Sequence, residues 1–216
     1  SSGMSQANLV QSDLQTVAPY SKYALDFDGV NDYIDCGDSD DFSFGDGTND
    51  FPFSVSAWIR PEAVEFAGIV AKYVTGSYEW LFYLTDLNKL RLLLLHNNTS
   101  NRYIVLTTDV AIPINTWTHV SATYNANSLP SGIDLYINGS LQSLVTEDSS
   151  NYQAMINTTS PLQIGSWQGN FRPINGLVSN VSIWNTALTS AQVSEIYNQG
   201  LPSNLNSHSA YSNLVS

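Results

Sequence analysis

The feature that most constrains the fold of this chain is a series of short segments in which hydrophobic and polar residues alternate, each ended by turn-forming residues. In the segment 53–59 the residues Phe53, Val55, Ala57 and Ile59 fall on one face, and Pro61 follows. A period of two puts successive side chains on opposite faces of a β-strand. Further segments of this kind lie at 23–28, 69–73, 80–85, 90–95, 103–108, 117–124, 133–137, 162–165 and 177–184. Strands at roughly ten-residue spacing predict an all-β sandwich or barrel.

Two local motifs refine this prediction. Asn138-Gly139 follows an alternating segment, and a two-residue type I′ hairpin turn requires positive φ at both of its central positions. Thr189 and Gln192 fit a capping box, in which a hydroxyl and an amide satisfy unpaired N–H groups of a first helical turn. Gly200 suits the left-handed residue that ends a helix. The sequence therefore predicts one short C-terminal helix that closes the sandwich.

The charge balance excludes several classes of partner. The 216 residues include 19 acidic and 7 basic side chains, a formal net charge of −12. Nucleic-acid binding needs a basic surface, and anionic membranes attract basic segments, so neither is expected. No apolar run reaches the length of a bilayer span, which excludes insertion as a helix. The single Cys36 rules out an intrachain disulfide framework, and His96, His119 and His208 lack metal-ligand spacing.

Three regions are expected along the chain. Residues 1–21 open with Ser1-Ser2-Gly3-Met4, which is typical of a cloning scar followed by a start residue, and continue as a polar, flexible segment. Residues 22–200 form the folded domain. Residues 201–216 are rich in Ser and Asn and are expected to be a linker toward a further segment.

Five blocks, taken in order, carry a resemblance to a known family. They are 25–34 (LDFDGVNDYI), 53–61 (FSVSAWIRP), 117–124 (WTHVSATY), 134–139 (DLYING) and 176–185 (GLVSNVSIWN), with the predicted helix behind them. Together they resemble the laminin-G-like, pentraxin-like branch of the concanavalin-A-type jelly rolls. The resemblance implies two antiparallel sheets packed face to face, whose loops bind calcium, sugars or protein partners in many members. It also implies an extracellular or surface-displayed location, with a virion as a further possibility.

The resemblance implies two possible calcium sites. At the paired-calcium positions of pentraxin-like members, this chain offers only Glu79 and Gln168, too few oxygen ligands for an ion that takes six to eight. The second site lies where the first and last strands meet in many laminin-G-like domains. There the candidate ligands are Asp26, Asp28, Asp32 and Asn180. The alternative is that these acids form turns through hydrogen bonds to the backbone. Calcium is therefore an optional cofactor.

Aromatic residues at the same two loop positions suggest a sugar-binding surface. If the two loops converge, as the resemblance implies, Tyr78, Trp80 and Trp167 form an aromatic platform on which a sugar ring stacks. Four polar side chains would bind the sugar hydroxyls: Glu79, Gln168, Asn170 and Arg172. The alternative is that these residues only pack the rim of the domain.

Catalysis finds no support in the sequence. Glucanases of this superfamily use strand-spaced carboxylates, whereas Glu62, Glu65, Glu79 and Glu147 have no acidic partner at that spacing. There is no Gly-x-Ser-x-Gly elbow and no phosphate-binding glycine loop. The prediction is a non-catalytic recognition module for glycan or a surface protein, with carbohydrate favoured. The alternatives are a structural or protein-interaction domain of an adhesion or virion protein, and an accessory domain of an enzyme.

Overall fold

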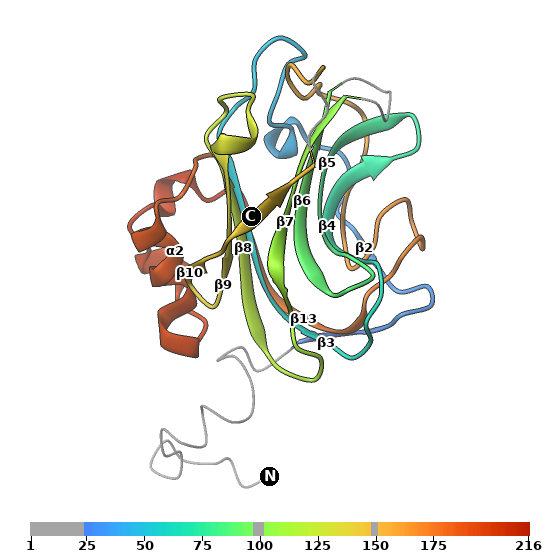
Figure 1. The fold of residues 1–216 in the computed structure, drawn as a ribbon, viewed down its shortest axis with the longest axis vertical. Coiled ribbons are helices and arrows are strands. Elements are labelled where there is room, and N and C mark those ends of the chain that lie inside the picture. The colour runs from blue at the N-terminus through green and yellow to red at the C-terminus, as the bar shows by residue number, and fades with distance from the viewer. Residues whose placement is uncertain (1–23, 97–101, 148–150) are drawn as a thin grey trace, which may run out of the picture.

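The computed structural model describes residues 24–96, 102–147 and 151–216 and contains two antiparallel sheets packed face to face (Figure 1). The six-stranded sheet has the order β1 (Leu25–Asp28), β13 (Asn175–Trp184), β3 (Phe53–Pro61), β8 (Thr118–Tyr124), β9 (Ile133–Ile137) and β10 (Ser140–Leu141). The seven-stranded sheet has the order β11 (Leu144–Thr146), β7 (Tyr103–Ala111), β6 (Lys89–Leu95), β5 (Ser77–Leu84), β4 (Ala67–Val74), β12 (Leu162–Ile164) and β2 (Ile34–Asp35). The jelly-roll sandwich predicted from the sequence is confirmed.

One helix, α2 (Ser190–Tyr197), covers the outer side of the six-stranded sheet (Figure 1). The predicted capping box is present: Thr189 Oγ1 accepts from the N–H of Gln192, and Gln192 Oε1 accepts from the N–H of Thr189. The helix ends at Asn198, which takes the left-handed conformation two residues before the predicted Gly200. Short 3₁₀ turns lie at Asp40–Phe42, Pro130–Gly132, Asn198–Gly200, Leu205–Ser207 and Tyr211–Asn213. Within the described ranges, no helix is long and apolar enough to cross a membrane.

The alternation of side chains in β5 decides which residues are available on the surface. Trp80 and Phe82 point into the main hydrophobic core between the sheets. Leu81 and Tyr83 belong to a separate cluster on the outer face of the same sheet. A strand with an apolar layer on both faces has no polar side, which is why the five consecutive residues from Trp80 to Leu84 are all hydrophobic.

The C-terminal residues are part of the packed domain. The N–H of Ile183 donates to the carbonyl of Ser216, and the N–H of Val215 donates to the carbonyl of Ile183. Ala210 is buried with Trp184 in a cluster that α2 completes. The prediction that 201–216 is a linker is therefore wrong for these residues, because a polar composition hides the few apolar side chains that anchor them. The other predicted flanking segment, 1–21, lies outside the described residues.

Candidate functional site

Two loops far apart in the chain meet beside the outer face of the seven-stranded sheet. The turn between β4 and β5 brings Thr75 within 2.7 Å of Gln168, and the Thr75 hydroxyl donates to the side-chain carbonyl. The N–H of Gln168 also donates to the carbonyl of Tyr73 at 3.3 Å. These contacts confirm the predicted meeting of the two loops.

The loop at 165–172 lies directly on β4. A Cβ at Gly68 would come within 2.6 Å of the Ser166 carbonyl carbon, so only glycine allows this approach. The N–H of Gly68 donates to the carbonyl of Arg172 at 3.0 Å, and Gly169 donates to Gln163 Oε1 at 3.0 Å. Backbone and side-chain bonds therefore fix both ends of the loop against the sheet.

Trp80 does not belong to an exposed platform, which corrects the prediction from sequence. Its side chain is completely buried and packs on Phe53, with ring centres 5.4 Å apart. Its indole N–H donates to the carbonyl of Phe42 at 3.0 Å. Because Trp80 faces the core side of β5, it cannot present a ring to a ligand.

Glu79 is also unavailable as a surface ligand. It is completely buried, and its Oε1 lies 3.4 Å from the Lys72 ammonium. The same oxygen accepts from the N–H and the hydroxyl of Thr158, each at 2.8 Å. Burial raises the pKa of Glu79, and the Lys72 charge and the Thr158 donors offset part of that effect. Glu79 is therefore part of an internal ion pair, and its predicted role in binding sugar hydroxyls is wrong.

Trp167 has reached the predicted loop position but is largely covered there. Its side chain is 7% exposed and packs edge-on against Tyr83 and Phe171, with ring centres 5.5 and 5.8 Å away. Ala71 and Leu81 lie beneath it on the outer face of the sheet. The predicted platform of Trp80 and Trp167 is thus not formed. Trp167 instead packs beneath the surface against Tyr83 and Phe171.

The exposed ring of this region is Phe171, which is 49% exposed. Next to it, the Arg172 guanidinium carbon lies 5.3 Å from the ring centre of Phe171 and 5.3 Å from that of Phe66. Phe66 in turn stacks on Tyr83 with ring centres 6.4 Å apart. We call the group Phe66, Tyr83, Trp167, Phe171 and Arg172 the aromatic–arginine surface.

The remaining predicted residues border this surface. Tyr78 is half-buried and packs on Tyr73, with ring centres 4.6 Å apart, at the end of the β4–β5 hairpin. Asn170 is exposed at the tip of the 165–172 loop, and Gln168 is partly exposed. Of the seven predicted ligand-binding residues, five therefore lie on or beside the surface, and Glu79 and Trp80 do not.

The four predicted calcium ligands do not converge, because the strand register separates them. Antiparallel pairing of β1 with β13 places Asn175 opposite Asp28 and Leu177 opposite Asp26. Asn180 lies five positions beyond Asn175 along β13, past Val178, the last residue of β13 that pairs with β1. The predicted use of Asn180 together with Asp28 and Asp32 is therefore wrong.

The carboxylates of Asp28 and Asp32 accept hydrogen bonds from backbone N–H groups in the turn after β1. Asp28 Oδ1 accepts from the N–H groups of Val30 and Asn31 at 2.8 and 3.2 Å. Asp32 Oδ2 accepts from the N–H of Asp28 at 3.1 Å. Throughout the part of the chain that is described, no three His, Cys, Asp or Glu side chains are grouped as metal ligands. These residues do not fit a calcium ion that takes six to eight oxygens.

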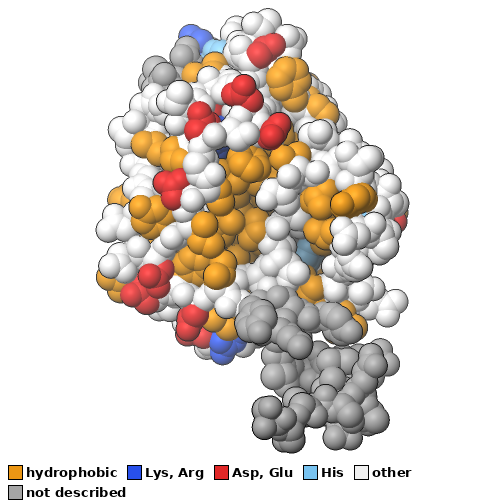
Figure 2. Space-filling view, turned by 180° about the vertical axis from the view of Figure 1, so that it is seen from behind, with side chains coloured by type: hydrophobic (Ala, Val, Ile, Leu, Met, Phe, Trp, Pro, Cys, Tyr) orange, Lys and Arg blue, Asp and Glu red, His pale blue; other side chains and the backbone are white. Residues whose placement is uncertain are grey.

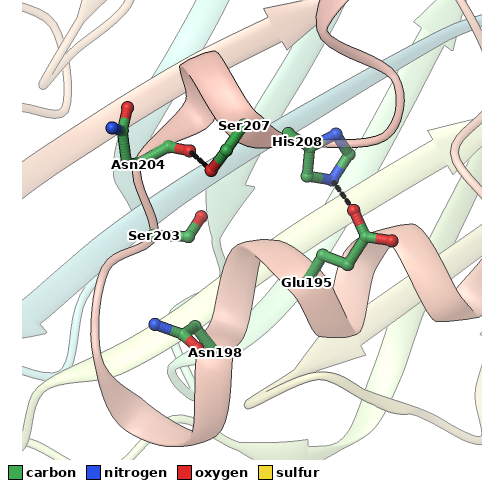
Figure 3. Close-up of a pocket in the computed structure, with 6 residues that line it drawn as sticks. All are labelled: Glu195, Asn198, Ser203, Asn204, Ser207 and His208. Carbon is green, nitrogen blue, oxygen red and sulfur yellow. Dashed lines mark hydrogen bonds and ion pairs between the residues drawn. The ribbon is translucent and has the colours of Figure 1, made fainter.

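A polar hollow of about 320 Å³ beside α2 contains the residue types of a hydrolase triad without its geometry (Figure 3). It is lined by Glu195, Asn198, Ser203, Asn204, Ser207 and His208. His208 Nε2 lies 3.5 Å from Glu195 and bonds the carbonyl of Gln192 at 2.9 Å, while its Nδ1 accepts from the N–H of Ala210. The Ser207 hydroxyl points away and donates to the Asn204 carbonyl. With both ring nitrogens engaged, His208 has no free position to activate a serine.

Sequence reasoning missed Phe66, Tyr83 and Phe171. Phe171 follows the predicted loop residues directly, so its ring could have been included on local grounds. Phe66 and Tyr83 come from distant segments, and only the fold brings them to the loop.

The comparisons with known proteins agree with this architecture. A laminin-G model, described as the concanavalin A-like lectin/glucanases superfamily, matches residues 28–194. No curated protein matches the chain in sequence.

Solved structures show the same fold at low sequence identity. The CBM40 of the Ruminococcus gnavus IT-sialidase, solved bound to α2,3-sialyllactose, is 12% identical over 82% of this chain and 96% of its own, with a TM-score of 0.60. The binding domain of Paraclostridial Mosquitocidal Protein 1 is 19% identical over 77% of this chain, with a TM-score of 0.57. That of Botulinum neurotoxin serotype G is 17% identical over 82%, with a TM-score of 0.54. The chain spans 40% and 47% of those two toxin chains.

Proposed function

This chain belongs to the concanavalin A-like lectin/glucanase superfamily, and on that premise we propose that it is a non-catalytic module that recognises carbohydrate. The proposed site is the aromatic–arginine surface with its polar border. The observation that carries the proposal is the exposed ring of Phe171, which is held beside Arg172 by contacts that join two distant loops.

The arrangement suits the two kinds of contact that a sugar requires. The C–H face of a pyranose loses water when it packs on an aromatic ring, and Phe171 offers the exposed ring. Sugar hydroxyls need hydrogen-bond partners, and Gln168, Asn170 and Arg172 lie in the same loop. Trp167 packs edge-on against the Phe171 ring. The loop is held before a ligand arrives, which reduces the entropy lost on binding.

The similarity to a CBM40 solved with a bound glycan supports the same class of ligand. A site with one exposed ring and a few amides is expected to bind weakly. Several copies in one assembly would then raise the overall avidity. The proposal includes an extracellular or surface-displayed location, where glycans of this kind are presented.

A glycan array tests the proposal with three proteins: the wild type, Phe171→Ala and Phe51→Ala. Phe51 is similarly exposed, at 45%, but precedes β3 and lies outside the surface. We expect the wild type and Phe51→Ala to bind the same glycans, and Phe171→Ala to lose them while keeping its melting temperature within a few degrees. An array without bound glycan, or binding that survives Phe171→Ala unchanged, would overturn the proposed site.

One observation favours a second function, the binding of a protein. Hydrophobic side chains gather in the middle of the face shown in Figure 2. Between β1, β12 and β13 a hollow of about 230 Å³ has a mainly apolar lining that includes Leu25, Ile164, Val178 and Val181. Leu25 is 46% exposed although it lies in a strand. Apolar patches of this kind are common where proteins associate.

Sedimentation velocity over a range of protein concentrations tests this second function through self-association. Association through the hollow should disappear in Leu25→Ser and persist in Phe171→Ala. A monomer at all concentrations would remove self-association as the role of this hollow.

A further inference from the structure

We infer that Arg172 forms a subsite for the carboxylate of an acidic sugar, so that the module recognises glycans carrying such a residue. The inference rests on the proposed carbohydrate function and specifies the chemical class of ligand at the same site.

Two phenyl rings lie next to the guanidinium of Arg172. Phe66 and Phe171 each lie 5.3 Å from the guanidinium carbon, within the range of a cation–π contact. A cation–π contact is electrostatic and does not require the N–H donors of the guanidinium as hydrogen-bond donors to another side chain. Two parallel donors in one plane match the two oxygens of a carboxylate.

The Arg172 charge has no acidic partner in the described part of the chain. Arg60, Lys72 and Arg91 each form an ion pair with a carboxylate, whereas Arg172 forms none. The comparison with Arg91 is direct, because Arg91 lies over the neighbouring Tyr83 ring. Arg91 is bound to Glu147 at 3.0 Å and to the Thr107 hydroxyl at 2.6 Å, which leaves Arg172 as the free cation of the aromatic–arginine surface.

Glu65 is the acidic residue nearest to this surface in the sequence. Glu65 precedes Phe66, and its Oε1 is buried without a hydrogen-bond partner in the described structure. Glu65 forms no ion pair with Arg172. The unpaired guanidinium therefore remains open to an anion from solution.

The net charge of the chain indicates what kind of anion this is. A formal charge of −12 repels polyanions over distances of about a Debye length. A single carboxylate on an otherwise neutral sugar meets little of that repulsion and gains the local contact with Arg172. The class is therefore a glycan with one carboxylate-bearing residue, either a sialic acid or a uronic acid, and not a heavily sulfated chain.

Isothermal titration with three probes tests the inference: lactose, α2,3-sialyllactose, and a lactose-sized glycan ending in glucuronic acid. We expect at least one acidic probe to bind about tenfold or more tightly than lactose, which is the scale of a charge-assisted bidentate contact. Whichever acidic probe binds more tightly shows whether the carboxylate belongs to a sialic acid or to a uronic acid. The preference should weaken as salt is raised, because the contact is exposed.

Variants connect the preference to Arg172. Arg172→Gln should remove the preference, so that the acidic probes bind no more tightly than lactose does to the same variant. Arg172→Lys should keep only part of the preference, because a lysine lacks the planar fork. Arg102→Gln is the matched control. Arg102 forms no ion pair with any residue that the structure describes, and it directly precedes β7, five positions before Thr107, the residue that binds Arg91. Melting temperatures close to that of the wild type show that each variant is folded.

The outcomes separate this inference from the proposed function. Equal binding of lactose and both acidic probes that is lost in Phe171→Ala but unchanged in Arg172→Gln overturns the carboxylate subsite and leaves the module a lectin. A preference for sulfated over carboxylated sugars also overturns it. Binding of no sugar by any of the folded proteins overturns both.

Discussion

The hydroxyl of Thr75 donates a hydrogen bond to the side-chain carbonyl of Gln168, 93 positions later in the chain, at 2.7 Å. This bond joins the β4–β5 hairpin to the loop that carries Phe171 and Arg172. The candidate site therefore depends on a contact between two segments that are unrelated in sequence.

A double-mutant cycle of Thr75→Val and Gln168→Ala measures this contact. Because the bond is exposed, we expect each single change to lower the free energy of unfolding by about 1 kcal/mol or less, with a coupling of roughly 0.5–1 kcal/mol between the two. Urea unfolding provides the free energies. Strictly additive effects would show that the two side chains do not interact in solution.

The buried position of Glu79 predicts a structural effect where a surface site would give a binding effect. Glu79→Ala removes one of the two carboxylates that pair with the buried Lys72 and leaves it with Asp38 and the carbonyl of Ser160, so the change should destabilise the domain by about 3–5 kcal/mol. Glu62→Ala is the control, since Glu62 pairs with Arg60 at the surface and should cost about 0–1 kcal/mol. Equal and small losses in the two variants would place Glu79 in solvent instead.

The interior histidine His119 predicts a pH dependence of stability. It is completely buried beside Trp58 and Tyr197, and neither ring nitrogen has a hydrogen-bond partner in the described structure. Burial lowers the pKa of His119 to about 3, whereas an unfolded histidine titrates near 6.5. Between these values the unfolded chain binds a proton that the folded chain does not.

Protonation therefore favours the unfolded chain in this range. The contribution of the neutral His119 to the free energy of unfolding is fully present above pH 6.5 and is lost as pH falls toward 3. Relative to His119→Phe, the wild type should lose about 1.4 kcal/mol per pH unit in this window. Urea unfolding of both proteins from pH 7 to pH 4 measures the difference. Parallel curves for the two proteins would mean that His119 is protonated in the folded state or has the same pKa in both states.

Calcium provides the fourth test. The structure predicts no change in melting temperature when millimolar calcium is added to chelated protein. The carboxylates of Asp28 and Asp32 accept hydrogen bonds from backbone N–H groups of their own turn, and Asn180 lies beyond the part of β13 that pairs with β1. An ion that binds only the folded state would stabilise it by about 2.7 kcal/mol at a hundred times its Kd. A clear rise in the melting temperature would therefore restore the calcium site expected from the sequence.

Most of the fold could be predicted from the sequence because its signals are local. Alternation identified the strands that form the two sheets, and the Asn138-Gly139 turn has positive φ at both residues, at 50° and 73°. The capping box fixed the start of the helix at Thr189. The sequence did not predict the two- and three-residue strands β2, β10 and β11, which are too short to show a periodic signal, or the packed C-terminal segment.

The candidate site could be predicted only in outline. The sequence located the two loops and their polar residues, but it assigned Trp80 to the surface. The strand Ser77–Leu84 is hydrophobic on both faces, so its pattern does not show which face each residue takes. A shift of one residue in register exchanges the two faces, and only the pairing with β4 settles it.

The amino-acid order by itself determined what depends on neighbours in the chain: strand-forming segments, turn geometry, the helix start and the surplus of acids. Tertiary structure decided that Glu79 has Lys72 as its partner, that Trp80 packs in the core, and that Arg172 contacts two phenyl rings. Each of these outcomes is a contact between segments far apart in the chain. Its energy depends on register and burial, which no local pattern of residues encodes.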